Sequence, residues 1–247
     1  MLKINKLTKK YGEKIALDSE NMEINKGEII GLFGKNGAGK TTLLKCILNL
    51  VDYKGKITLD NEYITRKNIH KFSFATYEHS FFPLLTPTDH EEFYANHFDA
   101  FKKERYEVLM DFFELPSNKP VRLLSAGQQN QFEAILALSQ GADYILMDEP
   151  FGGNDLFNRI DFYKIIVGML DSRETLLIST HLIEEVKSFI SRAILLDKGK
   201  IVANLSTENM EEKGINLIDE IERVFRYKYD RVGETLTRLG ECRLLIV

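Results

Sequence analysis

Eight residues, 34 to 41, carry the clearest chemistry in this sequence. They read Gly-Lys-Asn-Gly-Ala-Gly-Lys-Thr, the pattern of a loop that holds phosphate groups. Glycines let such a loop bring backbone N–H groups close to a phosphate, because no Cβ blocks the approach. We expect Lys40 to reach the β- and γ-phosphates and the Thr41 hydroxyl to bind Mg²⁺. The segment predicts a nucleoside triphosphate site, and a glycine-rich turn that matches by chance is the alternative.

The neighbouring residues predict the elements that such a loop needs. An apolar run at 29–33 is typical of a buried strand, and a helix-like run at 42–48 follows the loop. The N-terminal end of that helix adds positive partial charge to the phosphate site. We expect the nucleotide to contact Gly34, Asn36, Gly37, Ala38, Gly39, Lys40, Thr41 and Thr42.

A second chemical motif, Asp148-Glu149-Pro150, follows a buried apolar run. Carboxylates at the carboxyl end of a parallel strand point into the ligand crevice of an α/β sheet. We expect Asp148 to hold Mg²⁺, mostly through water, and Glu149 to polarise the water that attacks the γ-phosphate. A plain loop with an N-cap is the alternative interpretation of these residues.

The remaining pattern predicts how the chain is organised. Buried runs at 143–148 and 175–180, with a helix between them, indicate a parallel sheet covered on both faces. Four of the five prolines lie between 79 and 124, where helical patterns at 89–98 and 102–115 predict an inserted helical subdomain. Lys198-Gly199 marks a hairpin. We expect a nucleotide-binding core at 1–78 and 125–205, and a helical tail at 206–247.

Composition excludes several classes of protein. The chain has 247 residues, of which 44% are hydrophobic, and a net charge of −4, unlike a dedicated nucleic-acid binder. Cys46 and Cys242 lie far apart, so we expect no disulfide and a reducing compartment. No stretch approaches about 18 apolar residues, so we expect no membrane span. The N-terminus lacks the pattern of a secretory signal.

The segment Leu124-Ser125-Ala126-Gly127-Gln128 makes the assignment specific. With the motifs above, over roughly residues 1–205, the chain resembles the ATP-binding subunit of an ABC transporter, whose signature is usually Leu-Ser-Gly-Gly-Gln. The resemblance implies an α/β fold with a RecA-like P-loop NTPase core, an antiparallel β subdomain and an inserted helical subdomain. It also implies ATP and Mg²⁺ as cofactors and ATP hydrolysis as the activity.

The resemblance assigns roles to further residues. Tyr11 matches the aromatic that stacks on adenine, and His181 matches the histidine that contacts the γ-phosphate and helps hold the attacking water, so Glu149, His181 and Lys40 form the catalytic group. Ser125, Gly127 and Gln128 are expected to complete the ATP site of a second subunit, in a head-to-tail dimer of identical or different cassettes. Asn154-Asp155 falls in the loop that contacts the partner.

Four departures from the family pattern stand out. Ala126 replaces a signature glycine, and Gln131 stands where a basic residue is common. The loop Phe151–Asp155 has Asn154 in place of an apolar residue. The usual glutamine before the helical insert falls at Tyr77 or Glu78. Only Glu78 offers a carboxylate oxygen, so we expect Glu78 to join Thr41 and Asp148 at the metal.

These observations predict an ATPase that powers a separate integral-membrane permease, from the cytoplasmic side of the membrane. The stretch 217–225 resembles an ending common in exporter-type subunits, which favours export of peptides, antibiotics or lipids over import. The aromatics in the insert are expected to form its core, with Phe81 and Phe82 either in that core or in a groove for the permease. The alternatives are a nucleotide-gated switch with weak hydrolysis, or a soluble ABC protein acting on ribosomes or nucleic acid.

Overall fold

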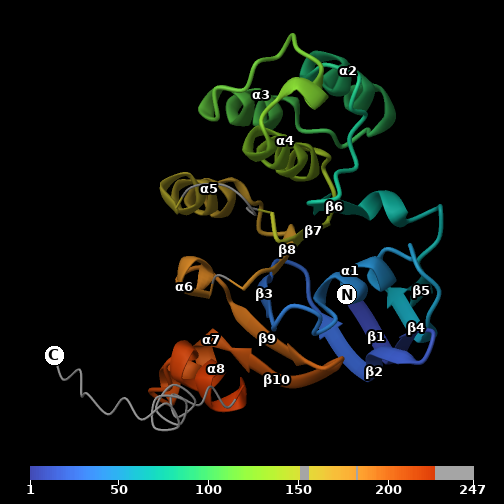
Figure 1. Ribbon diagram of the computed structural model, residues 1–247, viewed down its shortest axis with the longest axis vertical. Helices are drawn as coiled ribbons and strands as arrows, with labels where there is room; N and C mark the ends of the chain where they lie inside the picture. Colours follow the sequence, from blue (N-terminus) through green and yellow to red (C-terminus); the bar gives the residue numbers. More distant parts are fainter. Residues whose placement is uncertain (151–155, 182, 226–247) are drawn as a thin grey trace, which may run out of the picture.

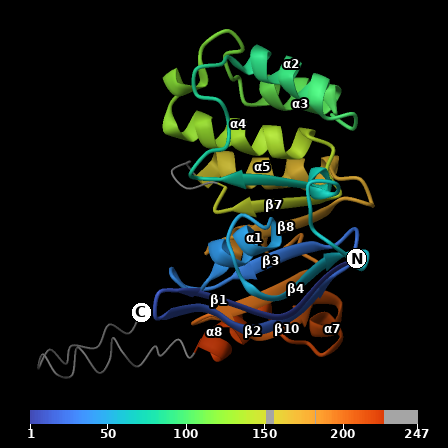
Figure 2. The same ribbon diagram turned by 90° about the vertical axis from the view of Figure 1, so that its right-hand side faces the viewer.

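Two β-sheets form the frame of the molecule (Figures 1 and 2). The computed structural model describes residues 1–150, 156–181 and 183–225. An antiparallel sheet of four strands has the order β2-β1-β4-β5, with β1 (Leu2–Tyr11), β2 (Lys14–Ile24), β4 (Lys54–Leu59) and β5 (Glu62–Tyr63). This is the predicted antiparallel subdomain.

The second sheet has six strands in the order β10-β9-β3-β8-β7-β6. Its members are β3 (Ile29–Phe33), β6 (Phe72–Thr76), β7 (Tyr144–Asp148), β8 (Thr175–Ser179), β9 (Arg192–Asp197) and β10 (Lys200–Ser206). Neighbouring strands from β9 to β6 are parallel, and β10 pairs antiparallel with β9 through the predicted hairpin. The predicted parallel sheet is therefore confirmed.

Both faces of the six-stranded sheet are buried, which explains the near-continuous apolar runs of its strands. Side chains alternate between two hydrophobic clusters along each strand. On β7, Tyr144 and Leu146 belong to the cluster between the two sheets, whereas Ile145 and Met147 belong to the cluster beneath the helices. Cys46 is buried in the cluster between the sheets, where burial raises the pKa of its thiol to about 11.

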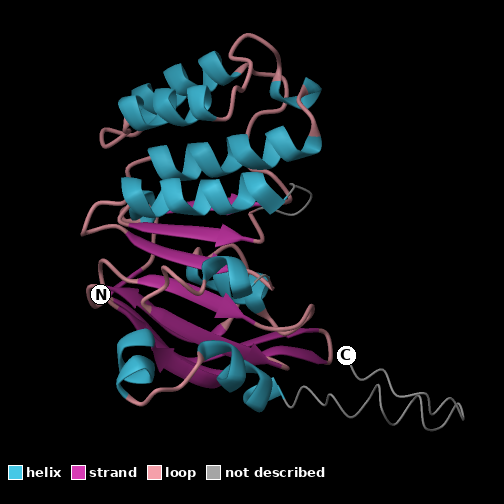
Figure 3. Cartoon of the chain, turned by 90° about the vertical axis from the view of Figure 1, so that its left-hand side faces the viewer, coloured by secondary structure: helices cyan, strands magenta, loops and turns pink. Residues whose placement is uncertain are grey.

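Helices cover these sheets on distinct sides (Figure 3). Helix α1 (Lys40–Ile47) contributes buried residues to the cluster between the sheets. Helices α2 (Pro87–His97), α3 (Lys103–Phe112) and α4 (Ala126–Ser139) gather at one end of the molecule, and α7 (Thr207–Glu212) and α8 (Leu217–Phe225) lie at the other (Figure 1). Helices α5 (Leu156–Met169) and α6 (Ile183–Val186), with the 3₁₀ turns Ile69–Lys71 and Val121–Leu123, complete the described elements.

Local sequence signals fix where the helices of the insert begin. Thr86 and Asp89 form a capping box at the start of α2, and Pro87 occupies its first turn. Ser125 and Gln128 form the same arrangement at the start of α4. The predicted helices at 89–98 and 102–115 correspond to α2 and α3, which lie with α4 (Figure 1). The proposed subdomain boundaries stay a prediction.

The aromatic side chains of the insert form a core between its helices. Phe132 of α4 is fully buried and contacts the rings of Phe81, His90 and Tyr106. His90 is also fully buried, and its Nε2 accepts a hydrogen bond of 3.0 Å from the Phe82 backbone. Phe81 therefore belongs to this core, whereas Phe82 is about half exposed.

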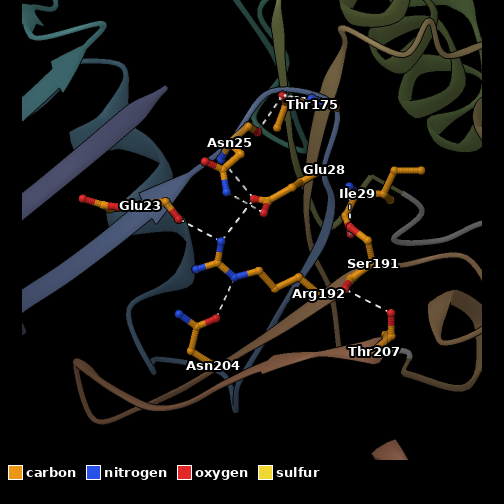
Figure 4. Close-up of polar contacts among 10 residues, drawn as sticks. Glu23, Asn25, Glu28, Ile29, Thr175, Ser191, Arg192, Asn204 and Thr207 are labelled. Carbon is orange, nitrogen blue, oxygen red and sulfur yellow. Dashed lines mark hydrogen bonds and ion pairs between the residues drawn. The ribbon is translucent and has the colours of Figure 1, made fainter. Parts of the chain in front are cut away.

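Polar side chains tie the two sheets together near the amino ends of the parallel strands (Figure 4). Arg192 of β9 donates to the Glu23 carbonyl at 2.8 Å and to the Glu28 carboxylate at 3.1 Å. Its Nε also donates to Asn204 of β10 at 2.6 Å. The Arg192 guanidinium thus joins both sheets at the edge opposite the carboxyl ends of the parallel strands. These contacts stabilise the packing of the two sheets.

Among the residues that the structure describes, no helix combines the length and the apolar character that crossing a membrane requires.

Candidate nucleotide site

The candidate site lies at the carboxyl edge of the parallel strands. Strands β3, β8 and β7 are neighbours in that order, so the residues that follow them leave the sheet side by side. Gly34 follows β3, Thr180 and His181 follow β8, and Glu149 follows β7. The backbone N–H of Glu149 still donates to the Ser179 carbonyl at 2.9 Å, which continues the ladder beyond β7. The two acidic residues and the loop are therefore brought together as predicted.

Close backbone contacts explain two glycines of the loop. A Cβ at Gly34 would lie 2.4 Å from the Leu196 carbonyl oxygen of β9. Gly39 has φ 113°, and a Cβ there would lie 2.6 Å from the Ala16 carbonyl oxygen of β2. Gly37 also has a positive φ, of 81°, with open space around it. The loop is thus packed against both sheets while its tip stays accessible.

Lys40 begins α1 and is only 6% exposed. Its ammonium donates to the Gly34 carbonyl at 2.8 Å and lies 3.5 Å from Glu149 Oε1. No side chain among the described residues caps this helix start, so the first backbone N–H groups of α1 are free to bind an anion. A buried cation and a helix N-terminus therefore converge at the loop.

Asp148 is fully buried, and its two carboxylate oxygens accept from two hydroxyl groups. Thr41 Oγ1 donates to Oδ2 at 2.6 Å, and Ser179 Oγ donates to Oδ1. The oxygens of Thr41 and Asp148 thus meet, as the sequence predicts, and oxygen ligands suit Mg²⁺. Within the described ranges no three acidic, histidine or cysteine side chains gather as a metal site.

Glu149 has a strained backbone, with φ 47°. Its Oε2 lies 2.9 Å from Nδ1 of His181, whose ring is largely exposed. Its Oε1 is buried beside Lys40 and has no hydrogen-bond partner in the part of the chain that the structure describes. Non-glycine residues with positive φ occur at functional sites because the surrounding structure holds them there. Glu149 is held between the buried lysine and the predicted histidine.

Lys40, Thr41 and the catalytic candidate Glu149 line one pocket of about 470 Å³, whereas Gly34, Asp148 and His181 are not among its lining residues. Most of the predicted nucleotide-binding residues line it: Tyr11, Asn36, Gly37, Ala38, Gly39, Lys40, Thr41 and Thr42. Tyr11 is 49% exposed, and the Lys9 ammonium lies 4.7 Å from its ring centre. The ring is half exposed beside the pocket, with Lys9 over one of its faces, and an exposed aromatic ring fits the adenine role that we predicted for it.

The pocket also contains residues that sequence reasoning missed. Lys14 and Ala16 come from β2, and Lys35 comes from the loop. Ser179, which holds Asp148, was also not singled out. Lys14 pairs with Tyr11 across the hairpin. Its closeness to Tyr11 in the sequence could have identified it as a pocket residue. Finding Ala16 required the sheet topology. Tyr77, which follows β6, also lines the pocket; it was one of the two residues named for its place, and Glu78 was preferred.

Glu78 does not line this pocket. Its carboxylate accepts two hydrogen bonds of 2.9 Å from Lys45 of α1, one turn beyond Thr41. The ion pair turns Glu78 toward α1, and the preceding residue, Tyr77, faces the pocket instead. The preference for Glu78 over Tyr77 at this site therefore conflicts with the observed geometry, and a metal role for Glu78 stays a prediction.

The signature residues lie elsewhere in the chain. Ser125 caps α4 by accepting from the Gln128 backbone N–H at 3.3 Å, and the Gln128 side chain accepts from the Ser125 N–H at 3.0 Å. Ser125, Gly127 and Gln128 do not line the pocket of their own chain. Their predicted use by a second subunit stays a prediction. The predicted partner-contact loop, 151–155, lies outside the described residues.

A phosphate-binding loop between a parallel strand and a helix, with an acidic pair on a strand two places along the sheet, defines a P-loop NTPase. The chain belongs to the ABC transporter family, since the family model described as ABC transporter matches residues 17–152. Its members include ATP-binding subunits that bind nucleotide and assemble as dimers, and the solved structures similar to this chain are such cassettes.

Two relatives and one cassette illustrate the similarity. An ABC transporter ATP-binding protein of Methanocaldococcus jannaschii is 29% identical over 208 residues, 81% of this chain and 76% of that protein. The lipopolysaccharide export system ATP-binding protein LptB of Haemophilus influenzae is 28% identical over 237 residues, which cover 91% of this chain and 96% of that protein. The dimeric bacterial ABC transporter cassette MJ0796 superposes with a TM-score of 0.73 at 25% identity, over 83% of this chain and 98% of that one. The same cassette is also known as a dimer bound to ADP and Pi.

Proposed function

We propose that this chain binds and hydrolyses ATP and drives a separate membrane permease, as an exporter of peptides, antibiotics or lipids. The observation that carries this proposal is the convergence of Lys40, Thr41, Asp148 and Glu149 at one edge of the sheet. A buried cation, two oxygen ligands and a carboxylate are the groups that phosphoryl transfer to water requires.

The residues divide the chemistry among them. The loop N–H groups, the start of α1 and Lys40 bind the phosphates. Glu149 orients and polarises the attacking water, and His181, 2.9 Å from Glu149, helps to hold that water against the γ-phosphate. Thr41 and Asp148 would hold Mg²⁺, which neutralises charge on the β- and γ-phosphate oxygens when it is bound.

A second cassette completes the site in this proposal. Ser125, Gly127 and Gln128 begin a 14-residue helix, α4, whose N-terminus suits a phosphate but lies away from the chain's own pocket. A head-to-tail dimer brings this helix start of one subunit to the ATP of the other, so that two ATP molecules are buried at the interface. The dimeric state of the cassette MJ0796 supports this arrangement.

Export is supported by two observations. LptB, a similar protein, is named as part of a lipopolysaccharide export system. The helix α8, at 217–225, matches the ending that led us to predict an exporter. We therefore assign the subunit to a peripheral position on the cytoplasmic side of the membrane, beside its permease.

A patch on the insert suits the permease. Phe82, Leu84 and Leu123 are exposed, and backbone hydrogen bonds of 2.9 Å and 3.0 Å join their two loops, from Val121 to Leu85 and from Arg122 to Pro83. Exposed apolar side chains gathered on neighbouring loops mark protein contact sites. We assign this patch to a cytoplasmic helix of the permease.

The test is ATP turnover by purified protein, alone and with membranes that contain a candidate permease. Mg²⁺-dependent release of phosphate that rises when the permease is present supports the proposal. ATP binding and dimerisation without turnover would instead identify a nucleotide-gated switch. Tight binding to RNA or DNA at physiological salt would point to a cassette that acts on nucleic acid.

A further inference from the structure

Asn36 and Gly37, in the phosphate-binding loop, form the only Asn-Gly pair in the sequence. Every other asparagine is followed by a residue with a side chain. In an Asn-Gly pair the backbone nitrogen of the glycine can approach the side-chain carbonyl carbon of the asparagine, because no Cβ on the glycine hinders it. The pair is therefore open to loss of the asparagine amide, a reaction that the assigned roles of the loop do not include.

The structure leaves this pair exposed in a turn. The Ala38 N–H donates to the Lys35 carbonyl at 3.0 Å, so Asn36 and Gly37 are the two central residues of a β-turn. Gly37 has φ 81°, and a Cβ there would have no atom within 4 Å. Asn36 and Gly37 are both exposed, whereas Gly34 and Ala38 on either side of the turn are buried. The turn thus projects from the packed part of the loop.

Neither reacting group of the pair is held by the rest of the described chain. Among the residues that the structure describes, none accepts a hydrogen bond from the Gly37 N–H, and none bonds to the Asn36 side-chain amide. Side-chain amides elsewhere do form such bonds, as at Asn21, Asn25 and Asn68. The Asn36 side chain can therefore rotate toward the Gly37 nitrogen without breaking a contact.

We propose that Asn36 is a site of non-enzymatic deamidation and that bound nucleotide protects it. The Gly37 backbone nitrogen forms a bond to Cγ of Asn36 and loses its proton. The bond from Cγ to the amide nitrogen breaks, and that nitrogen leaves with the proton as ammonia. Water then opens the cyclic imide at either of its two carbonyl carbons, which leaves aspartate or isoaspartate at position 36. Water is the only co-reactant.

The product changes the charge of the nucleotide pocket, which Asn36 lines together with Lys40. An aspartate side chain is ionised at neutral pH, and its charge repels the phosphates of a nucleotide. Isoaspartate also routes the main chain through the side-chain carbons, which displaces the N–H groups that follow. A chain that has lost this amide consequently binds ATP less tightly.

Bound phosphate opposes the reaction. In the proposed function the N–H groups of the loop bind the phosphates, and a Gly37 N–H that donates to a phosphate oxygen keeps its proton and does not attack Asn36. The protection therefore rests on the proposed function, whereas the deamidation itself does not.

The first test incubates the purified full chain at neutral and at mildly alkaline pH, with and without Mg²⁺ and a non-hydrolysable ATP analogue. Digestion at acidic pH and peptide mass spectrometry then measure conversion at each asparagine. We expect conversion at Asn36 that is faster at the higher pH, because the attacking nitrogen must lose its proton, and slower with the analogue. Asn61 is the internal control, since it is exposed in a turn with φ 69° but precedes Glu62.

Three results of this test would overturn parts of the proposal. Conversion at Asn36 no faster than at Asn61 removes the modification site. Equal conversion in Asn36→Gln, whose longer side chain closes the ring far more slowly, contradicts attack by the Gly37 nitrogen. An analogue that binds without slowing conversion contradicts the protection. A chain that deamidates at Asn36 but binds no nucleotide fails the proposed function and keeps the modification site.

The second test measures the effect on nucleotide binding. Asn36→Asp reproduces one product, and we expect the Kd of the analogue to rise about tenfold, because a negative charge is added beside the phosphates. Asn61→Asp is the matched control, which adds the same charge outside the pocket and leaves the Kd unchanged. Thermal unfolding of both variants checks that they are folded. An unchanged Kd in folded Asn36→Asp would contradict the expected loss of affinity.

Discussion

Glu149 is the residue on which the proposed hydrolysis depends. Its carboxylate lies between Lys40 and His181 on a backbone of positive φ, which fixes its direction. We predict that Glu149→Gln keeps ATP binding and lowers phosphate release by at least about 100-fold, since a general base contributes that much or more. Phosphate release and ATP binding are measured on the same preparation. Turnover at the wild-type rate would remove Glu149 from this role.

Lys40 is the residue on which the proposed ATP binding depends. Its buried ammonium is positioned by the Gly34 carbonyl, so removal leaves the phosphate site without its closest cation. We predict that Lys40→Ala abolishes detectable ATP binding in equilibrium dialysis. Lys35→Ala is the matched control, because this lysine of the same loop is exposed and we expect only a small loss. Comparable losses in the two variants would contradict a special role for Lys40.

At this scale the sequence predicted the residues whose spacing is local. Lys40 and Thr41 follow from one contiguous motif, and Asp148 and Glu149 follow from the end of one strand. Ser179 was missed because its proximity to Asp148 depends on the neighbours β7 and β8, which no local pattern records. Tyr77 was named as one of two candidates for its place, and Glu78 was preferred. Glu78 offered the better ligand chemistry, but its bond to Lys45 is a contact between distant segments.

At the scale of elements, the link between α4 and the turn after β6 has a measurable pH dependence. Burial raises the pKa of Glu133, and the hydrogen bonds from Ser80 offset this only in part. Between the usual carboxyl pKa and this raised value, the folded protein binds more protons than the unfolded chain. We therefore predict that the contribution of Glu133 to the free energy of unfolding falls as pH rises through this interval.

Glu133→Gln isolates that contribution, because glutamine keeps an acceptor for Ser80 but does not titrate. Urea unfolding at a series of pH values is compared for the two proteins. The nearby His90 has a pKa lowered by burial and changes stability with pH in the opposite direction, but it is present in both proteins and cancels in the difference. A constant difference across the series would contradict the prediction.

The elements themselves were largely predictable. Strand β7 reads as a continuous apolar run because it is buried on both faces, and α2 and α4 begin at capping residues that the sequence displays. The grouping of α4 with α2 and α3 was not explicit, since Phe132 contacts Tyr106 and Phe81 only after the chain has folded. Periodicity finds elements, whereas their packing partners come from tertiary structure.

At the scale of the whole molecule, the site in one chain lacks the signature helix that the family arrangement requires. We predict that the Glu149→Gln variant doubles in mass when ATP and Mg²⁺ are added. The variant is expected to hydrolyse ATP only slowly, so bound ATP keeps two cassettes together. Analytical ultracentrifugation with and without ATP measures this change. Lys40→Ala is the control and stays monomeric with ATP. Failure of the Glu149→Gln variant to associate would contradict the head-to-tail dimer.

The assembly is the property that this sequence predicts least well. Residues 217–225 led us to propose an exporter, and the exposed patch at Phe82 led us to propose a permease contact. In that proposal the permease, and not this chain, selects the transported molecule. These properties are set by complementarity between chains.

Cys46 gives the molecule a built-in reporter of opening. Its thiol is protonated at neutral pH, because its pKa is about 11, and it is enclosed between the two sheets behind the helix that carries Lys40. Thiolates react with alkylating reagents and thiols do not. The rate of Cys46 alkylation therefore reports how often the two sheets separate enough to expose this thiol. Peptide mass spectrometry distinguishes Cys46 from Cys242. If Cys46 is alkylated more slowly with ATP than without it, nucleotide binding suppresses this opening between the sheets.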